Sequence, residues 1–100
     1  MDREKILETL KKVSEEAYKT FPQIKKIILF GSLARGDHTG LSDVDLILVA
    51  TNLPKNPIER LKLFYPFFSD RIPIALDLIV IEENEMENIK HMLGGPTIIL

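Results

Sequence analysis

Apolar residues recur at three- and four-residue steps through the N-terminal part of the chain, the spacing that lines one face of an α-helix. The stripe is formed by Ile6, Leu10, Val13, Ala17 and Phe21. Asp2 is suited to cap the start of this helix, because its carboxylate accepts hydrogen bonds from unpaired amides, and Pro22 bars its continuation. The pattern therefore predicts an amphipathic helix from Asp2 to Phe21.

Three short segments rich in apolar residues, several of them β-branched, predict β-strands. They are Lys25–Phe30 (KKIILF), Asp43–Ala50 (DVDLILVA) and Ile74–Ile81 (IALDLIVI). The connection between the second and third segments is long and helical, which is typical of parallel neighbours and excludes a tight hairpin. The last four residues, TIIL, are expected either to add an edge strand or to dock against another chain.

Two more helices are expected in the second half of the chain. Asn56-Pro57 has the composition of a helix start, and this helix is expected to run toward Phe64 or Tyr65, where Pro66 ends or kinks it. Glu82–Leu93 has apolar residues at helical spacing and is followed by Gly94-Gly95-Pro96, which stops a helix. Helices that alternate with strands indicate an α/β fold.

Length, composition and charge limit the number of domains and the kinds of partner that this chain can have. A chain of 100 residues, 45% hydrophobic and 28% charged, fits a single domain over residues 1–100. A domain of this size buries only about 60 to 70% of its unfolded surface, so a partner chain is left open. The formal net charge is −2 with scattered basic residues, so extended nucleic-acid binding is not expected.

The sequence has no cysteine and no segment that resembles a secretory signal or a membrane-spanning helix, which bears on its ligand atoms and on its cellular location. The chain has no cysteine, so a metal or substrate must be held by oxygen or nitrogen atoms, and a reducing compartment is favoured. The N-terminal residues do not resemble a secretory signal, and the apolar runs are shorter than the roughly 20 residues of a membrane-spanning helix. We therefore expect a soluble, cytoplasmic protein with no membrane contact.

Residues 31 to 46, GSLARGDHTGLSDVDL, carry the candidate chemistry. A sharp turn at Gly31-Ser32 is expected to lead into a short helical turn over Leu33–Gly36 and a polar loop over Asp37–Ser42. Gly31 allows the backbone to approach a bulky anion, while Ser32 and the following amides are donors for phosphate oxygens. This segment is expected to form an anion cradle.

Three aspartates are the candidate metal ligands and catalytic groups. Asp43 and Asp45 are two positions apart on a predicted strand, so they point the same way and repel each other unless a cation is present. Mg²⁺ is the expected cation, because it prefers oxygen ligands and shares one or two carboxylates with substrate phosphates. Asp77 lies early in the next strand, and the starts of parallel neighbours meet at one end of the sheet. We therefore predict that all three carboxylates converge there.

These features differ in how specific they are. A Gly-Ser turn or an Asp-x-Asp pair alone is weak evidence, because both are common at strand ends. Asp77 is more telling, since a carboxylate among apolar neighbours is expected to be desolvated unless a metal or partner compensates. Arg35 has two open interpretations, a phosphate ligand or a surface salt-bridge residue.

The combination resembles the signature of the DNA polymerase β-like nucleotidyltransferase superfamily, in its smallest form, the minimal nucleotidyltransferases. The matching residues are Gly31-Ser32, Ala34-Arg35-Gly36, Ser42-Asp43-Val44-Asp45 and the later lone Asp77. The resemblance implies a palm-like mixed β-sheet flanked by helices. It further implies a nucleotide site at Gly31, Ser32, Arg35 and Ser42, and two Mg²⁺ ions at Asp43, Asp45 and Asp77.

The resemblance also implies an activity and a partner. The expected reaction moves a nucleoside monophosphate, AMP from ATP, onto a hydroxyl group, with pyrophosphate as the leaving group. Many minimal nucleotidyltransferases are antitoxins paired with a helical HEPN toxin, which points to a protein acceptor and a hetero-oligomer. The alternative is a non-catalytic antitoxin that neutralises its partner by covering it.

Overall fold

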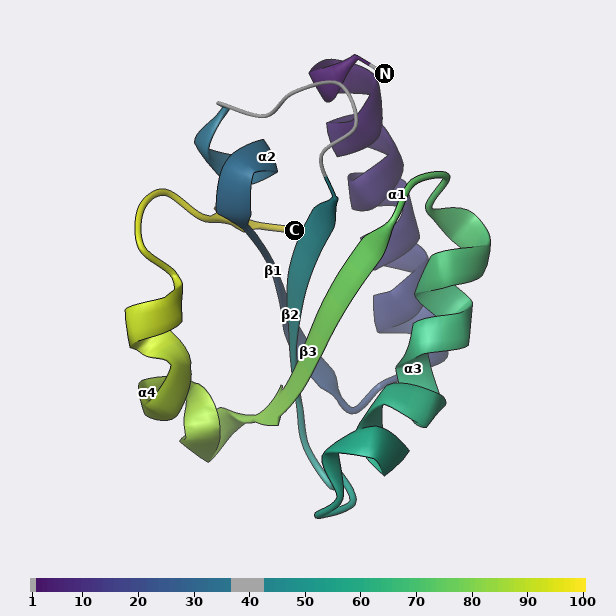
Figure 1. The fold of residues 1–100 in the computed structure, drawn as a ribbon. Helices are drawn as coiled ribbons and strands as arrows, with labels where there is room; N and C mark the ends of the chain where they lie inside the picture. Colours follow the sequence, from purple (N-terminus) through teal and green to yellow (C-terminus); the bar gives the residue numbers. More distant parts are fainter. Residues whose placement is uncertain (1, 37–42) are drawn as a thin grey trace.

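The computed structural model describes residues 2–36 and 43–100, whose four strands form one mixed sheet (Figure 1). The strands are β1 (Ile24–Phe30), β2 (Val44–Ala50), β3 (Leu76–Glu82) and β4 (Ile98–Ile99), in the spatial order β3-β2-β1-β4. β2 and β3 are parallel, as the long helical connection between them predicts, whereas β1 is antiparallel to both of its neighbours. The last residues of the chain thus form the expected edge strand.

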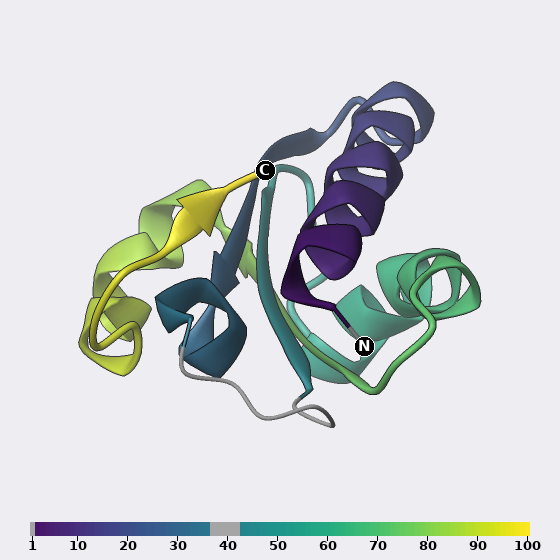
Figure 2. The same cartoon turned by 90° about the horizontal axis from the view of Figure 1, so that it is seen from above.

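Two long helices cover one face of this sheet (Figures 1 and 2). They are α1 (Arg3–Thr20), capped by the Asp2 carboxylate as predicted, and α3 (Pro57–Arg71), capped by Asn56. Their apolar sides and the inward residues of the strands form the main core, in which Phe64 and Phe68 are fully buried. No helix in the described part of the chain is long and apolar enough to cross a membrane.

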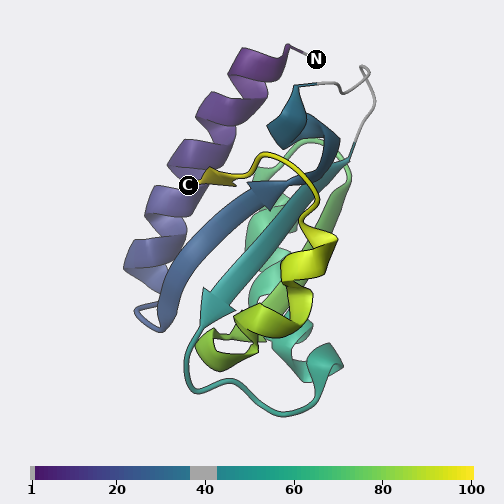
Figure 3. The ribbon, with the colours of Figure 1, turned by 90° about the vertical axis from the view of Figure 1, so that its left-hand side faces the viewer.

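The opposite face of the sheet is covered by shorter elements (Figure 3). These are α4 (Met86–Ile89) and the 3₁₀ turns η1 (Glu83–Glu85) and η2 (Lys90–Met92) on either side of it. The short helix α2 (Gly31–Arg35) follows β1, and its Leu33 and Ala34 are buried in the main core. Met86 and Ile89 of α4 pack on a second apolar cluster that includes Ile47 and Val49. Because side chains alternate along a strand, Asp45 of β2 lies on this second face.

The end of α3 corrects the sequence prediction. The helix was expected to run toward Phe64 or Tyr65 and to end or kink at Pro66, and it does not end there but continues to Arg71. Proline in a helix interior costs about 3 kcal/mol, because one backbone hydrogen bond is lost and the ring crowds the preceding turn. Phe64, Phe68 and Ile72 are each at most 5% exposed at four-residue spacing. Their burial offsets that cost.

Other boundaries also differ from the predictions, and those of α1, β1 and β2 do so by a single residue at one or both ends. The segment expected as one helix over Glu82–Leu93 is divided into η1, α4 and η2. The helical turn expected at Leu33 begins two residues earlier, at Gly31, and β3 begins at Leu76 rather than at Ile74. The polar loop predicted over residues 37–42 lies outside the described residues.

A buried arginine joins α3 to the end of the sheet. Arg60 is 9% exposed, and its Nε donates a hydrogen bond to the Pro54 carbonyl at 2.6 Å. One terminal nitrogen donates to the Val80 carbonyl at 3.4 Å and to Oε1 of Glu85 at 2.7 Å. The guanidinium therefore connects α3, the preceding loop, β3 and η1.

Replacing Arg60 by methionine is expected to lower the free energy of unfolding by about 2–4 kcal/mol, because the carbonyls of Pro54 and Val80 lose their donor. Denaturant unfolding measures this loss. The matched control is Lys62→Ala, whose pair with Glu59 is exposed and is worth at most about 1 kcal/mol. Equal effects of the two substitutions would contradict the role of Arg60.

Candidate active site

Two of the three candidate aspartates are direct neighbours across parallel strands. Asp45 of β2 is in register with Asp77 of β3, so the two carboxylates start from adjacent strands on one face of the sheet. Neighbouring strands are about 4.8 Å apart, which places both side chains within reach of one ligand. Asp43 lies just before β2, two residues from Asp45, and is exposed. The acids are thus gathered at the end where β2 and β3 begin.

The electrostatics of Asp45 reflect this concentration of negative charge. Partial burial raises the pKa of the Asp45 carboxyl, and the charges of Asp77 and Asp43 raise it further. The positive charge of Arg35 acts in the opposite direction. The ionised form of Asp45 is therefore disfavoured by its surroundings, and a cation bound beside it would relieve the repulsion.

Asp77 corrects one step of the sequence argument. Its apolar neighbours indicated a desolvated carboxylate, but Asp77 is exposed at the second position of β3. The apolar residues that follow it, Leu78, Val80 and Ile81, are buried deeper in the sheet. Asp77 therefore needs no partner to be solvated.

The turn after β1 lies directly against Asp45. Phe30 is in register with Asp45, and Gly31 follows with a φ of +78°, in the left-handed region. A Cβ on Gly31 would lie 3.1 Å from Cγ of Asp45 and would collide with its Oδ2. A residue with a side chain is therefore strained at this position, and the turn lies against the Asp45 carboxylate.

Arg35 ends α2 and contacts the C-terminal loop. A Cβ on Gly95, whose φ is +120°, would meet Cδ of Arg35 at 3.2 Å, so the loop packs on the stem of this side chain. The guanidinium charge acts on Asp45. An interaction with the Asp45 carboxylate is compatible with both interpretations of Arg35, as a phosphate ligand and as a salt-bridge residue.

The contact that Arg3 makes with α2 was not predicted from the sequence. The Arg3 guanidinium, at the start of α1, donates hydrogen bonds to the carbonyls of Leu33 and Ala34 in α2. These partners are about thirty residues away, so no local pattern indicates them. The other predicted site residue, Ser42, lies outside the described residues.

The donor atoms fit a magnesium ion shared with a substrate. In the part of the chain that the structure describes, no group of three or more His, Cys, Asp or Glu side chains is arranged to hold a metal ion. Mg²⁺ does not need such a cage, because one or two carboxylates commonly bind it together with substrate phosphates and water. Asp45 and Asp77, both oxygen donors in register on adjacent strands, satisfy that requirement.

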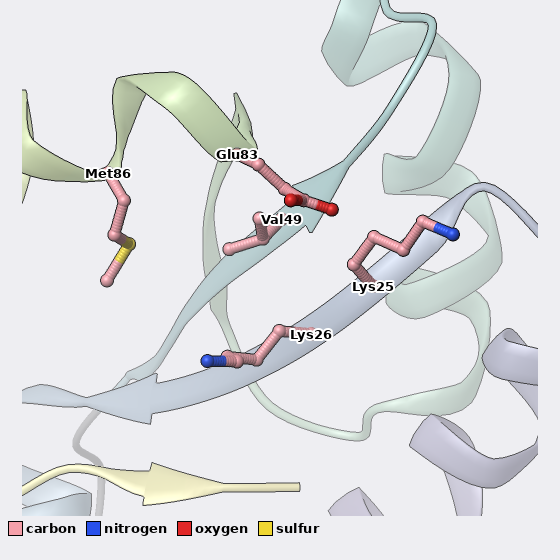
Figure 4. A pocket seen from close by; sticks show the side chains of 5 residues that line it. All are labelled: Lys25, Lys26, Val49, Glu83 and Met86. Carbon is pink, nitrogen blue, oxygen red and sulfur yellow. The ribbon is translucent and has the colours of Figure 1, made fainter.

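A separate cavity of about 300 Å³ lies at the other end of the same face (Figure 4). It is lined by Lys25 and Lys26 of β1, Val49 of β2, Glu83 of η1 and Met86 of α4. Val49 is near the end of β2, whereas Asp45 is near its start. The cavity is therefore not part of the acid site.

Comparison with protein families gives one match that spans most of the chain. The model of the nucleotidyltransferase domain matches residues 7–94. A putative protein adenylyltransferase of Methanocaldococcus jannaschii is 43% identical over 63 residues, which cover 60% of this chain and 43% of that protein. The match thus spans less than half of that relative. A second protein of the same name and organism is 36% identical over 85 residues, 83% of this chain and 76% of the relative.

A solved structure has the same fold. A putative nucleotidyltransferase from Sulfolobus solfataricus superposes with a TM-score of 0.75 and 28% sequence identity. The superposition covers 97% of this chain and 80% of the other. The mixed sheet flanked by helices is therefore shared with that protein.

Proposed function

The chain belongs to the family of nucleotidyltransferase domains, and from this premise we propose that it transfers AMP from ATP to a hydroxyl group. The observation that carries the proposal is the register of Asp45 with Asp77, beside a glycine turn that touches the Asp45 carboxylate. Oxygen ligands for a cation and a close backbone approach for a phosphate chain thus lie together. Both are needed for phosphoryl-group chemistry.

Each site residue has a distinct task in this reaction. Gly31 and Ser32 bind the triphosphate, with Arg35 and Ser42 as further phosphate contacts. Asp43 and Asp45 hold Mg²⁺, and Asp77 shares an ion or takes the proton of the attacking hydroxyl. When bound, Mg²⁺ neutralises the phosphate charge and stabilises the leaving pyrophosphate.

The bonds change at the α-phosphorus. The acceptor oxygen forms a bond to this atom while the bond to the bridging oxygen of pyrophosphate breaks in line. The hydroxyl proton leaves with Asp77 or with water, and pyrophosphate carries away the electron pair of the broken bond. The register of Asp45 with Asp77 on adjacent strands supports a mechanism in which the ion and the nucleophile would be held on the same face of the sheet.

The proposed acceptor is a hydroxyl on a partner protein, with a helical HEPN toxin as the expected partner. The names of the relatives, protein adenylyltransferases, support a protein acceptor. In this function the chain acts as an antitoxin that attaches AMP to the toxin. The alternative, an antitoxin that acts by covering the toxin without chemistry, makes a different prediction for labelling.

A labelling experiment tests the proposal. We expect the purified chain, incubated with Mg²⁺ and ATP labelled on the α-phosphate, to label a helical partner that carries an Arg-x₄-His motif. EDTA is expected to abolish the label, because without a cation the carboxylates repel the negatively charged triphosphate. Neutralisation of the partner without any label would favour the covering role. Label on RNA or on a small molecule without the partner would contradict a protein acceptor.

A further inference from the structure

α2 carries the Gly31–Ser32 turn, yet it has little internal support. It has five residues, and its last turn is closed by a 3.0 Å hydrogen bond from the Gly36 amide to the Ser32 carbonyl. The final carbonyls of any helix have no partner within the helix. So short a helix therefore depends on contacts from outside to keep its position.

Arg3, the first residue of α1, supplies such a contact. Its Nε donates to the Leu33 carbonyl at 3.0 Å and a terminal nitrogen donates to the Ala34 carbonyl at 3.4 Å. The guanidinium is a planar fork that presents both donors at once, and its charge is favourable at the negative end of a helix. One side chain thus binds two consecutive carbonyls of α2.

The start of α1, from which the Arg3 side chain extends to α2, is held in place by the core. Arg3 is the first residue of α1, directly after the Asp2 cap. The next turn of α1 is fixed in the main core by Ile6, which is 2% exposed. Arg3 therefore joins α2 to the core rather than to a mobile segment.

We propose that Arg3 is a positioning residue for nucleotide binding, which holds α2, and with it the Gly31–Ser32 turn, against Asp45. This inference rests on the proposed function. Leu33 and Ala34 directly follow the turn in the same helix, so a displacement of these carbonyls moves Gly31 and Ser32. A Cβ on Gly31 would collide with Oδ2 of Asp45, so the turn and the acid are closely spaced and a shift of α2 would change that spacing.

The test compares Arg3→Ala and Arg3→Lys with Tyr18→Phe. The Tyr18 hydroxyl accepts from the Ile27 amide and donates to the Leu100 carbonyl, both at 3.0 Å. Its loss therefore also removes two hydrogen bonds from a half-buried side chain of α1. Tyr18 lies about 22 Å from Arg3 along the helix, so this control destabilises the fold without disturbing α2.

Three measurements are made on each variant: the affinity for a non-hydrolysable ATP analogue with Mg²⁺ by calorimetry, hydrogen exchange at the amides of residues 33–36, and the midpoint of thermal unfolding. Arg3→Ala is expected to weaken binding about tenfold, as for residues that orient a binding group without touching the ligand. It is also expected to speed amide exchange in α2. Arg3→Lys is expected to restore part of both, since it keeps the charge and one donor.

Tyr18→Phe is expected to lower the unfolding midpoint and leave the affinity unchanged. Wild-type affinity and wild-type exchange in a folded Arg3→Ala chain would overturn the proposal. Equal losses of affinity in Arg3→Ala and Tyr18→Phe would overturn it too, because the effect would then follow general stability. If the wild-type chain itself binds no nucleotide, the proposed function fails, and the exchange at residues 33–36 alone decides whether Arg3 anchors α2.

Discussion

Replacing Asp45 by asparagine is expected to reduce AMP transfer roughly a thousandfold, equal to about 4 kcal/mol of transition-state stabilisation. The amide keeps the shape of the side chain but removes the charge that attracts the cation. The same change is expected to leave the metal-free chain at least as stable as the wild type at neutral pH. Burial and the charges of Asp77 and Asp43 raise the pKa of Asp45, so its ionised form is disfavoured in the folded chain and the neutral amide removes that cost.

The two effects are measured separately. Labelling from ATP reports the transfer, and thermal unfolding in EDTA reports the stability. Glu8→Gln is the control for the loss of one carboxylate charge, because Glu8 is exposed in α1 and belongs neither to the acid group nor to the glycine turn. A loss of activity with unchanged or higher stability assigns the Asp45 charge to the chemistry. Full activity of Asp45→Asn would remove this residue from the proposed mechanism.

The site's geometry was largely predictable from local patterns. Period-two alternation places Asp45 and Ile47 on one face of β2, and the structure has Ile47 in the apolar cluster of that face, with Asp43 just before the strand. The length of the connection after β2 predicts a parallel neighbour, which brings Asp77 into register with Asp45. Both inferences use local rules, the alternation of side chains along a strand and the length of a connection, which do not depend on how the rest of the chain folds.

The misplaced boundaries depend on packing across the molecule. The helix-breaking tendency of proline predicts that α3 ends or kinks at Pro66, but the burial of Phe68 and Ile72 stabilises its continuation beyond that residue. The divided C-terminal helix has a similar cause. The Glu85 carboxylate accepts from the Glu82 amide and pairs with buried Arg60, which favours a 3₁₀ turn before α4. The sequence near Glu85 does not reveal that contact, because Arg60 lies in α3.

The two structural arginines were beyond sequence reasoning for the same reason. Arg3 and Arg60 bind backbone carbonyls that are far away in the chain, and any residue type presents a carbonyl. The pattern of side chains along the sequence therefore does not indicate such contacts. The exposure of Asp77 was missed because its apolar neighbours suggested burial, whereas position at the open end of the strand decides it.

Gly31 is the residue whose replacement is expected to damage both fold and activity. Alanine at this position meets two obstacles. The left-handed backbone, with a φ of +78°, costs a residue with a side chain about 1–2 kcal/mol. The new Cβ would also collide with Oδ2 of Asp45. Together they are expected to lower the free energy of unfolding by about 2–4 kcal/mol.

The collision also predicts the loss of activity. The Asp45 carboxylate and the turn cannot both keep their places, so one of them moves by the order of an ångström. A displacement of about 1 Å at a reacting site costs roughly a hundredfold in rate. We therefore expect Gly31→Ala to retain about one hundredth of the wild-type transfer rate, even at temperatures where the chain is folded.

Gly94→Ala separates this effect from the general cost of replacing glycine. Apart from Gly94 itself and its two chain neighbours, no atom of residues 2–36 or 43–100 lies within 4 Å of the position of a new Cβ on Gly94, and its backbone is not in the left-handed region. Alanine there is expected to leave both the unfolding free energy and the labelling rate at wild-type values. If Gly31→Ala behaved as Gly94→Ala does, the contact between the turn and Asp45 would not constrain the site. Loss of both properties in Gly31→Ala alone would tie the glycine turn to the acid pair as one structural unit.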